Sequence, residues 1–259
     1  MAPILVENGV ALVRARHGPM LVPATDTRVG RALLDEGAYC EDEVRLLQAL
    51  LRPGATALDA GAHVGPHTLP MARAVGPAGR VFAFEPQPHL FRLLCGNLAL
   101  NGLAQAEPVE AALGAAQGDV ARPDVDYFRP GNFGAVALGT GPHRVPVLTV
   151  DGLDLADCRL IKIDVEGMEA AVLDGARATI ARCRPALYVE NNRRDRSPAL
   201  IGRLLDLGYA CWWHPARYGA AADSLWELNM VALPRAVAEL VMGLRPVSGA
   251  EDWYPGAPG

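Results

Sequence analysis

Short apolar segments alternate with helical segments from residue 56 to residue 207, and this alternation most constrains the fold. The apolar segments are nearly continuous runs of the kind buried on both faces of a parallel sheet: TALDA (56–60), RVFAFE (80–85), PVEAAL (108–113), LIKID (160–164) and ALYVE (186–190). Helical patterns lie among them at 67–75, 88–100, 168–181 and 197–207. The chain is therefore predicted to be an α/β protein with a doubly wound sheet.

The segments on either side of this alternation predict two additions to it. Residues 4–23 favour three short strands, because Asn8-Gly9 is a strong hairpin signal, and two helical stretches divided at Gly37 follow. The late strands at 209–214 and 229–233 lack a crossover helix, so we expect an antiparallel pair at the sheet edge. The expected organisation is an N-terminal β-hairpin and helical appendage (1–40), an α/β domain (41–235) and a C-terminal helix with a Pro/Gly-rich tail (236–259).

Charge and composition exclude several classes of protein. The net charge of −5 argues against a general nucleic-acid binder. No run of about 18 apolar residues marks a membrane helix, and the N-terminus lacks the pattern of a secretory leader. The five cysteines are widely spaced and form no CxxC pair, which favours reduced thiols. We therefore expect a soluble, cytoplasmic protein that binds neither nucleic acid nor membrane.

The segment ALDAGAHVG (57–65) carries the strongest functional signal. Gly61 and Gly65 form a strand-to-helix turn that lets a ligand approach the backbone. The spacing is GxxxG rather than the GxGxxG of dinucleotide sites, and Asp59 at the strand tip would repel a pyrophosphate. The same carboxylate would attract a cofactor with a cationic amino-acid end and no phosphate, such as S-adenosylmethionine.

Glu85 ends the next strand, where a carboxylate can accept hydrogen bonds from both hydroxyls of a ribose. The structural alternative is that the two glycines only permit tight packing and that Glu85 is a solvated strand end. The acid, the glycine spacing and the second acid together favour a cofactor site.

This turn, with Thr68, Phe84-Glu85-Pro86 and IKIDVEGMEAAVLDGA (161–176), resembles the FkbM family of S-adenosylmethionine-dependent methyltransferases. The resemblance covers about residues 40–233 and makes 41–235 an FkbM-type methyltransferase domain. It implies a class I, Rossmann-like methyltransferase fold whose seven-stranded sheet has the order 3-2-1-4-5-7-6, with the last strand antiparallel. It also implies O-methylation of a hydroxyl on a sugar or natural product. One departure is His63, which stands where the family usually has Asn.

The cofactor contacts that we expect come from the glycine turn, the two following strand ends and the helix before the turn. They are Asp59, Ala60, Gly61, Ala62, His63, Gly65, Thr68, Glu85, Pro86, Asp164 and Glu41.

Methyl transfer to a hydroxyl also needs a base or a metal that promotes loss of the hydroxyl proton. Asp164 and Glu166 follow one strand, and Glu190 and Asn191 end the next, so these side chains should meet at one edge of the sheet. We expect Asp164, Glu166 and Glu190 to be catalytic, and the all-oxygen set Asp164, Glu190 and Asn191 to suit Mg²⁺ or Ca²⁺. The alternative is that Asp164 contacts the cofactor, Glu190 pairs with Lys162, and no metal binds.

His214 is an alternative base, although a lone histidine is more often a packed structural residue. The basic run 193–196 would favour an anionic acceptor if it flanks the entrance, and is a solvated surface otherwise. Loops 114–146 and 215–228 are expected to shape the acceptor pocket. Two other functions stay open at this point: an NAD-linked oxidoreductase, and a noncatalytic binding module on the same scaffold.

Overall fold

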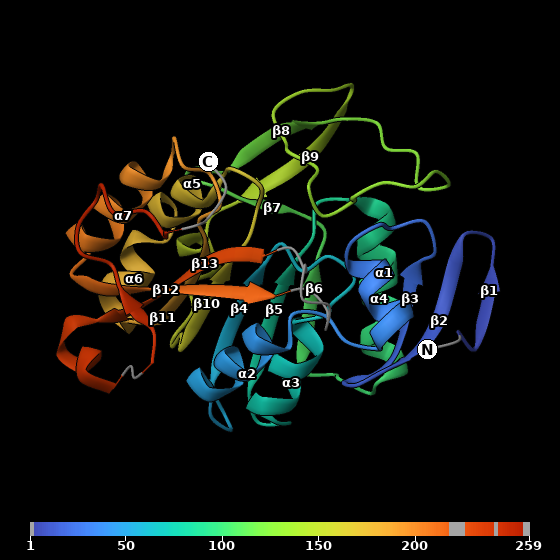
Figure 1. Cartoon of the computed structure of the whole chain (residues 1–259), viewed down its shortest axis with the longest axis horizontal. Helices are drawn as coiled ribbons and strands as arrows, with labels where there is room; N and C mark the ends of the chain where they lie inside the picture. The colour runs from blue at the N-terminus through green and yellow to red at the C-terminus, as the bar shows by residue number, and fades with distance from the viewer. Residues whose placement is uncertain (1–2, 218–225, 241–242, 256–259) are drawn as a thin grey trace.

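A large mixed sheet forms the centre of the protein (Figure 1). The computed structural model describes residues 3–217, 226–240 and 243–255. From one edge to the other the sheet contains β14 (Arg245–Pro246), β12 (Tyr209–Arg217), β13 (Trp226–Pro234), β11 (Ala186–Glu190), β10 (Leu160–Ile163), β4 (Thr56–Ala60), β5 (Arg80–Phe84) and β6 (Ala106–Val109).

The observed strand order confirms the expected class I arrangement. Strands β6, β5, β4, β10 and β11 are parallel, and β13 runs antiparallel between β11 and β12. This is the order 3-2-1-4-5-7-6 with one difference, because the two-residue strand β14 adds an eighth strand beyond β12. The predicted pair at 209–214 and 229–233 does form, but β13 is an interior strand.

Two other sequence predictions need correction. The expected strand at 108–113 is divided between β6 in the main sheet and β7 (Ala112–Leu113) in a separate one. The expected helix at 168–181 is two helices, α5 (Glu169–Asp174) and α6 (Arg177–Cys183). Gly175 lies between them, and a Cβ there would be 2.0 Å from the Gly114 carbonyl oxygen. Close approach to the Gly114 segment explains why the chain turns at this residue.

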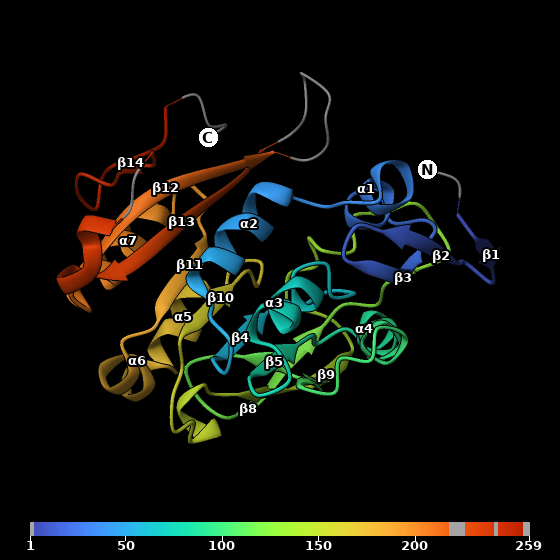
Figure 2. The same ribbon diagram turned by 90° about the horizontal axis from the view of Figure 1, so that it is seen from below.

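Helices cover both faces of the sheet (Figure 2). One face packs against α2 (Glu41–Leu50), α3 (Thr68–Val75) and α4 (Pro88–Leu100), and the other against α5, α6 and α7 (Ser197–Asp206). Alternate strand residues enter the two layers: Ala57 joins the first, whereas Leu58 joins the second. Each strand therefore needs apolar residues on both faces, which is why the sequence pattern identified the strands.

The N-terminal appendage is a three-stranded antiparallel sheet of β1 (Leu5–Glu7), β2 (Val10–Ala15) and β3 (Gly18–Pro23), followed by α1 (Val29–Glu36). It confirms the predicted strands and the helix break at Gly37. Asn97 of α4 holds it in place by accepting from Leu21 N and donating to the Leu21 and Val64 carbonyls. Apolar residues of β2 and β3 join the same core cluster as α3 and α4, so the core is continuous across the proposed boundary at residue 40.

A third sheet of β7, β9 (His143–Leu148) and β8 (Gly118–Arg122) arises from the stretch that interrupts the alternation, and lies at the top of Figure 1. Beyond β13, residues 235–240 form a 3₁₀ helix rather than a longer C-terminal helix. The described part of the tail packs against β12, with Trp253 and Tyr254 edge-on to Trp213. Most of the predicted 215–228 loop, at 218–225, and the end of the tail, at 256–259, lie outside the described residues.

The five cysteines are free thiols, as the sequence predicted. Among the described residues, the helices are too short or too polar to cross a membrane.

Candidate active site

The turn after β4 brings two strand ends into contact. Gly61 has a φ of +82°, and a Cβ at this position would be only 1.7 Å from the carbonyl oxygen of Asp164. A side chain at residue 61 would therefore collide with the backbone that follows β10. The glycine is required for the close approach that places Asp164 beside the turn.

Several expected cofactor residues instead lie inside the protein. Gly65 allows α3 and α4 to pack, because a Cβ there would be 2.9 Å from the Leu94 side chain. Ala60, Ala62 and Thr68 are buried, and none of them lines the cavity described below. The side chains at these positions therefore pack within the protein.

Asp59 is fully buried beneath the turn. The Thr68 hydroxyl donates to its Oδ2 at 2.6 Å, and Lys162 Nζ lies 3.1 Å from its Oδ1. Burial lowers the pKa of Lys162, but the carboxylates of Asp59 and Asp164 outweigh this and raise it above its ordinary value. The charge of Asp59 is thus balanced internally, and Lys162, not Asp59, lines the cavity.

Glu85 lies where the sequence predicted a ribose-binding acid. One carboxylate oxygen accepts from His63 N at 2.9 Å and the other from Gln87 N at 2.8 Å. Burial raises the pKa of Glu85, although His63 and these backbone donors oppose the rise. Its side chain lines two adjoining cavities, and Pro86 lines the smaller one.

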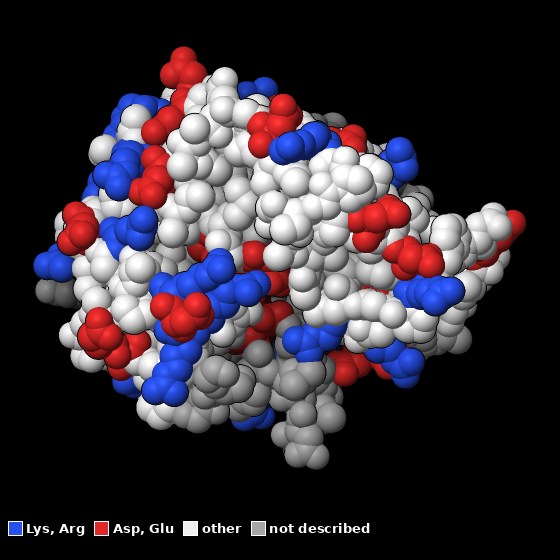
Figure 3. Space-filling model, turned by 90° about the horizontal axis from the view of Figure 1, so that it is seen from above, with Lys and Arg blue, Asp and Glu red and all other residues white. Residues whose placement is uncertain are grey.

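The two cavities form one site at the carboxyl ends of the strands. The larger has a volume of about 200 Å³. The smaller, about 40 Å³, is mostly apolar, with side chains of Ala111, Leu113, Val136, Leu138 and Met168. Both share Gly61, Glu85, Gly134, Asp164 and Glu166. Figure 3 shows carboxylate atoms deep in a hollow with cationic groups along its rim.

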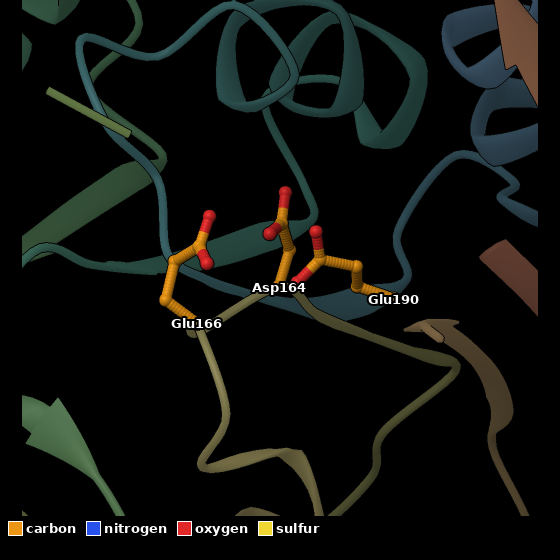
Figure 4. Close-up of side chains that lie close together, drawn as sticks. All are labelled: Asp164, Glu166 and Glu190. Carbon is orange, nitrogen blue, oxygen red and sulfur yellow. The ribbon is translucent and has the colours of Figure 1, made fainter. Parts of the chain in front are cut away.

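Asp164, Glu166 and Glu190 form what we call the carboxylate cluster (Figure 4). One oxygen from each lies within 4.8 Å of the others, and the three carboxyl ends point to the same side. Burial, then Asp164, raises the pKa of Glu166 to about 7 against the effect of Arg193. Burial, followed by Asp164 and Glu166, also raises the pKa of Glu190 well above its ordinary range.

Asn191 does not line the cavity, so its place in the metal set stays a prediction that its observed contacts do not favour. Its side-chain amide donates to Ser197 Oγ at 2.9 Å and contacts the Met230 sulfur at 3.3 Å. Glu190 and Asn191 point to opposite faces because they are consecutive residues at a strand end. The next residue, Asn192, does line the cavity, and it donates to Glu190 Oε1.

His214 and Glu41 also lie away from the cavity. His214 contacts Tyr188, whose hydroxyl lies 2.7 Å from His214 Nδ1. His214 lines a different surface cavity. Glu41 binds the appendage through Arg16 at 3.2 Å and His17 at 2.9 Å. The structure therefore gives both residues structural contacts in place of the predicted roles.

His63 does line the cavity, in a left-handed backbone conformation with φ +53°. Its Nε2 lies 3.3 Å from Asp26 Oδ2, so the imidazole links the glycine turn to the appendage. In the basic run, Arg193 Nη2 lies 2.6 Å from Glu166 Oε2 and Arg196 donates to the Gly167 carbonyl. Arg193 is thus paired with an acid of the site, whereas Arg196 is exposed.

The sequence prediction missed four cavity residues from distant segments: Arg28, Tyr39, His67 and Glu227. His67 Nε2 lies 3.2 Å from buried Glu43, which also accepts from Asn229 at 2.8 Å. Burial, then Asp164, raises the pKa of Glu227 to about 8. In the sequence, the acidic residues in the first turn of α2 were the only sign of these contacts. Favourable negative charge at a helix N-terminus explained those residues equally well.

Residues 59–211 match the methyltransferase FkbM domain. The chain belongs to the FkbM methyltransferase family. No curated protein shows significant similarity to it.

Several solved structures resemble the chain at low sequence identity. Trm5b of Pyrococcus abyssi aligns over 89% of this FkbM-family chain and 57% of its own, with 14% identity and a TM-score of 0.50. The FkbM methyltransferase of Methylobacillus flagellatus KT aligns over 78% and 52%, with 16% identity and a TM-score of 0.46. Precorrin-6y C5,15-methyltransferase of Geobacter metallireducens GS-15 aligns over 74% and 89%, with 16% identity and a TM-score of 0.49.

Proposed function

We propose that this methyltransferase binds S-adenosylmethionine and transfers its methyl group to a hydroxyl oxygen of a small-molecule acceptor, such as a sugar or natural product. One observation carries the proposal: a single site joins an apolar slot, a buried strand-end acid and a group of carboxylates. These three parts match an adenine, a ribose and a cationic methionine end in chemical character.

The residues present fit this donor. The apolar side chains of the smaller cavity would hold the adenine, and Glu85 would accept from the ribose hydroxyls. Gly61, which lines both cavities, would adjoin the methionine end, with Asp164 beside it. When bound, S-adenosylmethionine supplies an electrophilic methyl group on a cationic sulfur.

The acceptor side is the carboxylate cluster and its surroundings. A hydroxyl must lose its proton as the new carbon–oxygen bond forms, and a carboxylate within hydrogen-bond reach can accept that proton as a general base. Lys162 holds Asp164 at 3.5 Å, and Arg193 holds Glu166 at 2.6 Å, which fixes the positions of both acids. Much of the rate would come from this positioning. Arg28 and Arg193 also supply cationic groups that favour an acceptor with an anionic substituent.

A dinucleotide-dependent oxidoreductase is disfavoured by charge. Five carboxylates line the larger cavity, and a pyrophosphate would be repelled by them. A noncatalytic binding module would bind the donor without methylating an acceptor, so only a turnover assay separates it from an enzyme.

Donor binding is tested by calorimetry with S-adenosylmethionine and S-adenosylhomocysteine. We expect Glu85→Gln to weaken both by about tenfold or more, because a charge-assisted hydrogen bond is lost. The matched control is Glu107→Gln, which removes an acid paired with Arg80 at the neighbouring strand, outside the cavity. An unmodified chain that binds neither compound would refute the proposal.

Acceptor chemistry is tested by incubating the chain with S-adenosylmethionine and a panel of hydroxyl, amine and carbon acceptors. Mass spectrometry detects the added methyl group, and NMR locates the atom that carries it. Methylation of amines or carbons alone would overturn the oxygen-directed part of the proposal while leaving donor binding intact.

A further inference from the structure

In each of the three acids of the carboxylate cluster, one carboxylate oxygen has a close partner. One oxygen of each is engaged: Asp164 Oδ2 by Lys162, Glu166 Oε2 by Arg193, and Glu190 Oε1 by Asn192. One oxygen of each acid also lies within 4.8 Å of the others, so the three carboxylates converge on one point.

Glu190 makes the strongest case for a missing ligand. Its side chain is only 5% exposed, and its Oε2 is buried without a hydrogen-bond partner within the described chain. The same side chain lines the larger cavity. A buried carboxylate oxygen that lacks a donor costs free energy, unless the cavity holds a group that binds it.

The charge balance of the cavity identifies the kind of ligand. Its acidic lining residues are Glu85, Asp164, Glu166, Glu190 and Glu227, whereas Lys162 and Arg28 are its lysine and arginine residues. Lys162 also lies closer to Asp59, at 3.1 Å, than to Asp164, at 3.5 Å. The methyl donor carries a sulfonium, an ammonium and a carboxylate, so it adds only one net positive charge. Arg193 offsets part of the charge of Glu166. A divalent cation would match the negative charge that remains, since hard cations prefer oxygen ligands.

We propose that Asp164, Glu166 and Glu190 bind a hard divalent cation, Mg²⁺ or Ca²⁺, through one carboxylate oxygen of each, with the unpartnered Glu190 Oε2 among them. This inference rests on the proposed function in one respect, because it gives the cation the task of binding the acceptor hydroxyl and lowering its pKa. The hydroxyl proton then passes to water, the carbon–oxygen bond forms, and the carbon–sulfur bond of the donor breaks. Water and the acceptor complete the coordination, since three protein ligands leave positions open.

The test measures cation binding directly, without turnover. Chain freed of metal by chelator and saturated with S-adenosylhomocysteine is titrated with Mn²⁺ and followed by electron paramagnetic resonance, with Mg²⁺ and Ca²⁺ as competitors. We expect one bound Mn²⁺ per chain, displaced by one of the competitors. Glu190→Gln and Asp164→Asn should each weaken the affinity by at least about tenfold. Circular dichroism checks that each variant is folded.

Glu227→Gln is the matched control, because it removes a cavity acid outside the cluster. We expect it to leave Mn²⁺ affinity within about threefold of the unmodified chain. Equal losses in all three variants would mean diffuse attraction by the cavity and would overturn the proposal. Absence of Mn²⁺ binding in chain that does bind S-adenosylhomocysteine would also overturn it, while leaving the proposed function standing. Failure to bind S-adenosylhomocysteine would refute the proposed function instead.

Discussion

The two halves of the site differ in how their acids are satisfied. In the half formed by β4 and β5, Glu85 accepts two backbone N–H groups, and Asp59 is held by Thr68 and Lys162. In the half formed by β10 and β11, Glu166 and Glu190 face Asp164 across less than 5 Å, and Glu190 Oε2 lacks a partner in the described chain. In the first half each acid has a hydrogen-bond donor or a cation beside it, whereas in the second half three carboxylates face one another.

This difference indicates a division of labour. Acids that are already hydrogen-bonded hold a turn in one shape, which suits recognition of a neutral nucleoside. Acids that repel one another destabilise the empty protein and are retained where a ligand or a reaction needs them. Removing an acid should therefore have opposite effects on stability in the two halves.

The largest effect is expected for Asp59→Asn. It leaves buried Lys162 without its nearest carboxylate, and breaking a buried pair costs about 3–5 kcal/mol. Glu190→Gln should instead raise the free energy of unfolding by about 1 kcal/mol, because it removes a buried carboxyl group and, with it, repulsion from Asp164 and Glu166. Urea denaturation of both variants, without added metal, measures the two effects. Loss of stability in both would remove the distinction between the halves.

Gly61→Ala tests the glycine turn in the half of the site formed by β4 and β5. The left-handed backbone and the collision with the Asp164 carbonyl should together cost about 3 kcal/mol. Gly54→Ala is a matched control, since Gly54 has a φ of +81° and no atom within 4 Å of the added Cβ. It should cost about 1 kcal/mol, so the difference between the variants isolates the collision. Similar losses in urea denaturation would show that the turn tolerates a side chain.

The pH dependence of stability extends the comparison to Glu227. Its raised pKa means that the folded chain holds this proton more tightly than the unfolded chain. The free energy of unfolding should therefore fall as pH rises from about 4.5 to about 8. Burial, Asp164 and Glu166 raise this pKa, while Arg28 and Tyr39 oppose the rise. Urea denaturation across this window should show a shallower pH dependence for Glu227→Gln, and an unchanged slope would contradict the assignment.

The smallest effect on turnover is expected for His214→Ala. Loss of the contact with the Tyr188 hydroxyl should cost about 1–2 kcal/mol of stability. Turnover, measured once an acceptor is identified, should stay within about twofold, because His214 opens on a different cavity. A loss of turnover that follows the titration of an imidazole would restore His214 as a base.

The sequence predicted most of the fold because the buried strands require apolar residues on both faces. It predicted Glu85 and Asp164 on the cavity wall because parallel strands end at one edge of a sheet. It failed for Glu41 and His214, whose partners come from the appendage and from β11. It also missed Arg28 and Glu227, because their segments reach the cavity only after folding.

The sequence by itself determined the order of elements, the glycine turn and the strand ends at which acids occur, because these depend on local periodicity and backbone conformation. Only the tertiary structure decided which acids meet. Glu166 turns toward Asp164 through a left-handed backbone with φ +55°, followed by Gly167 at +99°. Asn191 instead turns inward to Ser197. A change of one residue, or of one backbone angle, reverses the direction of a side chain, and long-range packing fixes that choice.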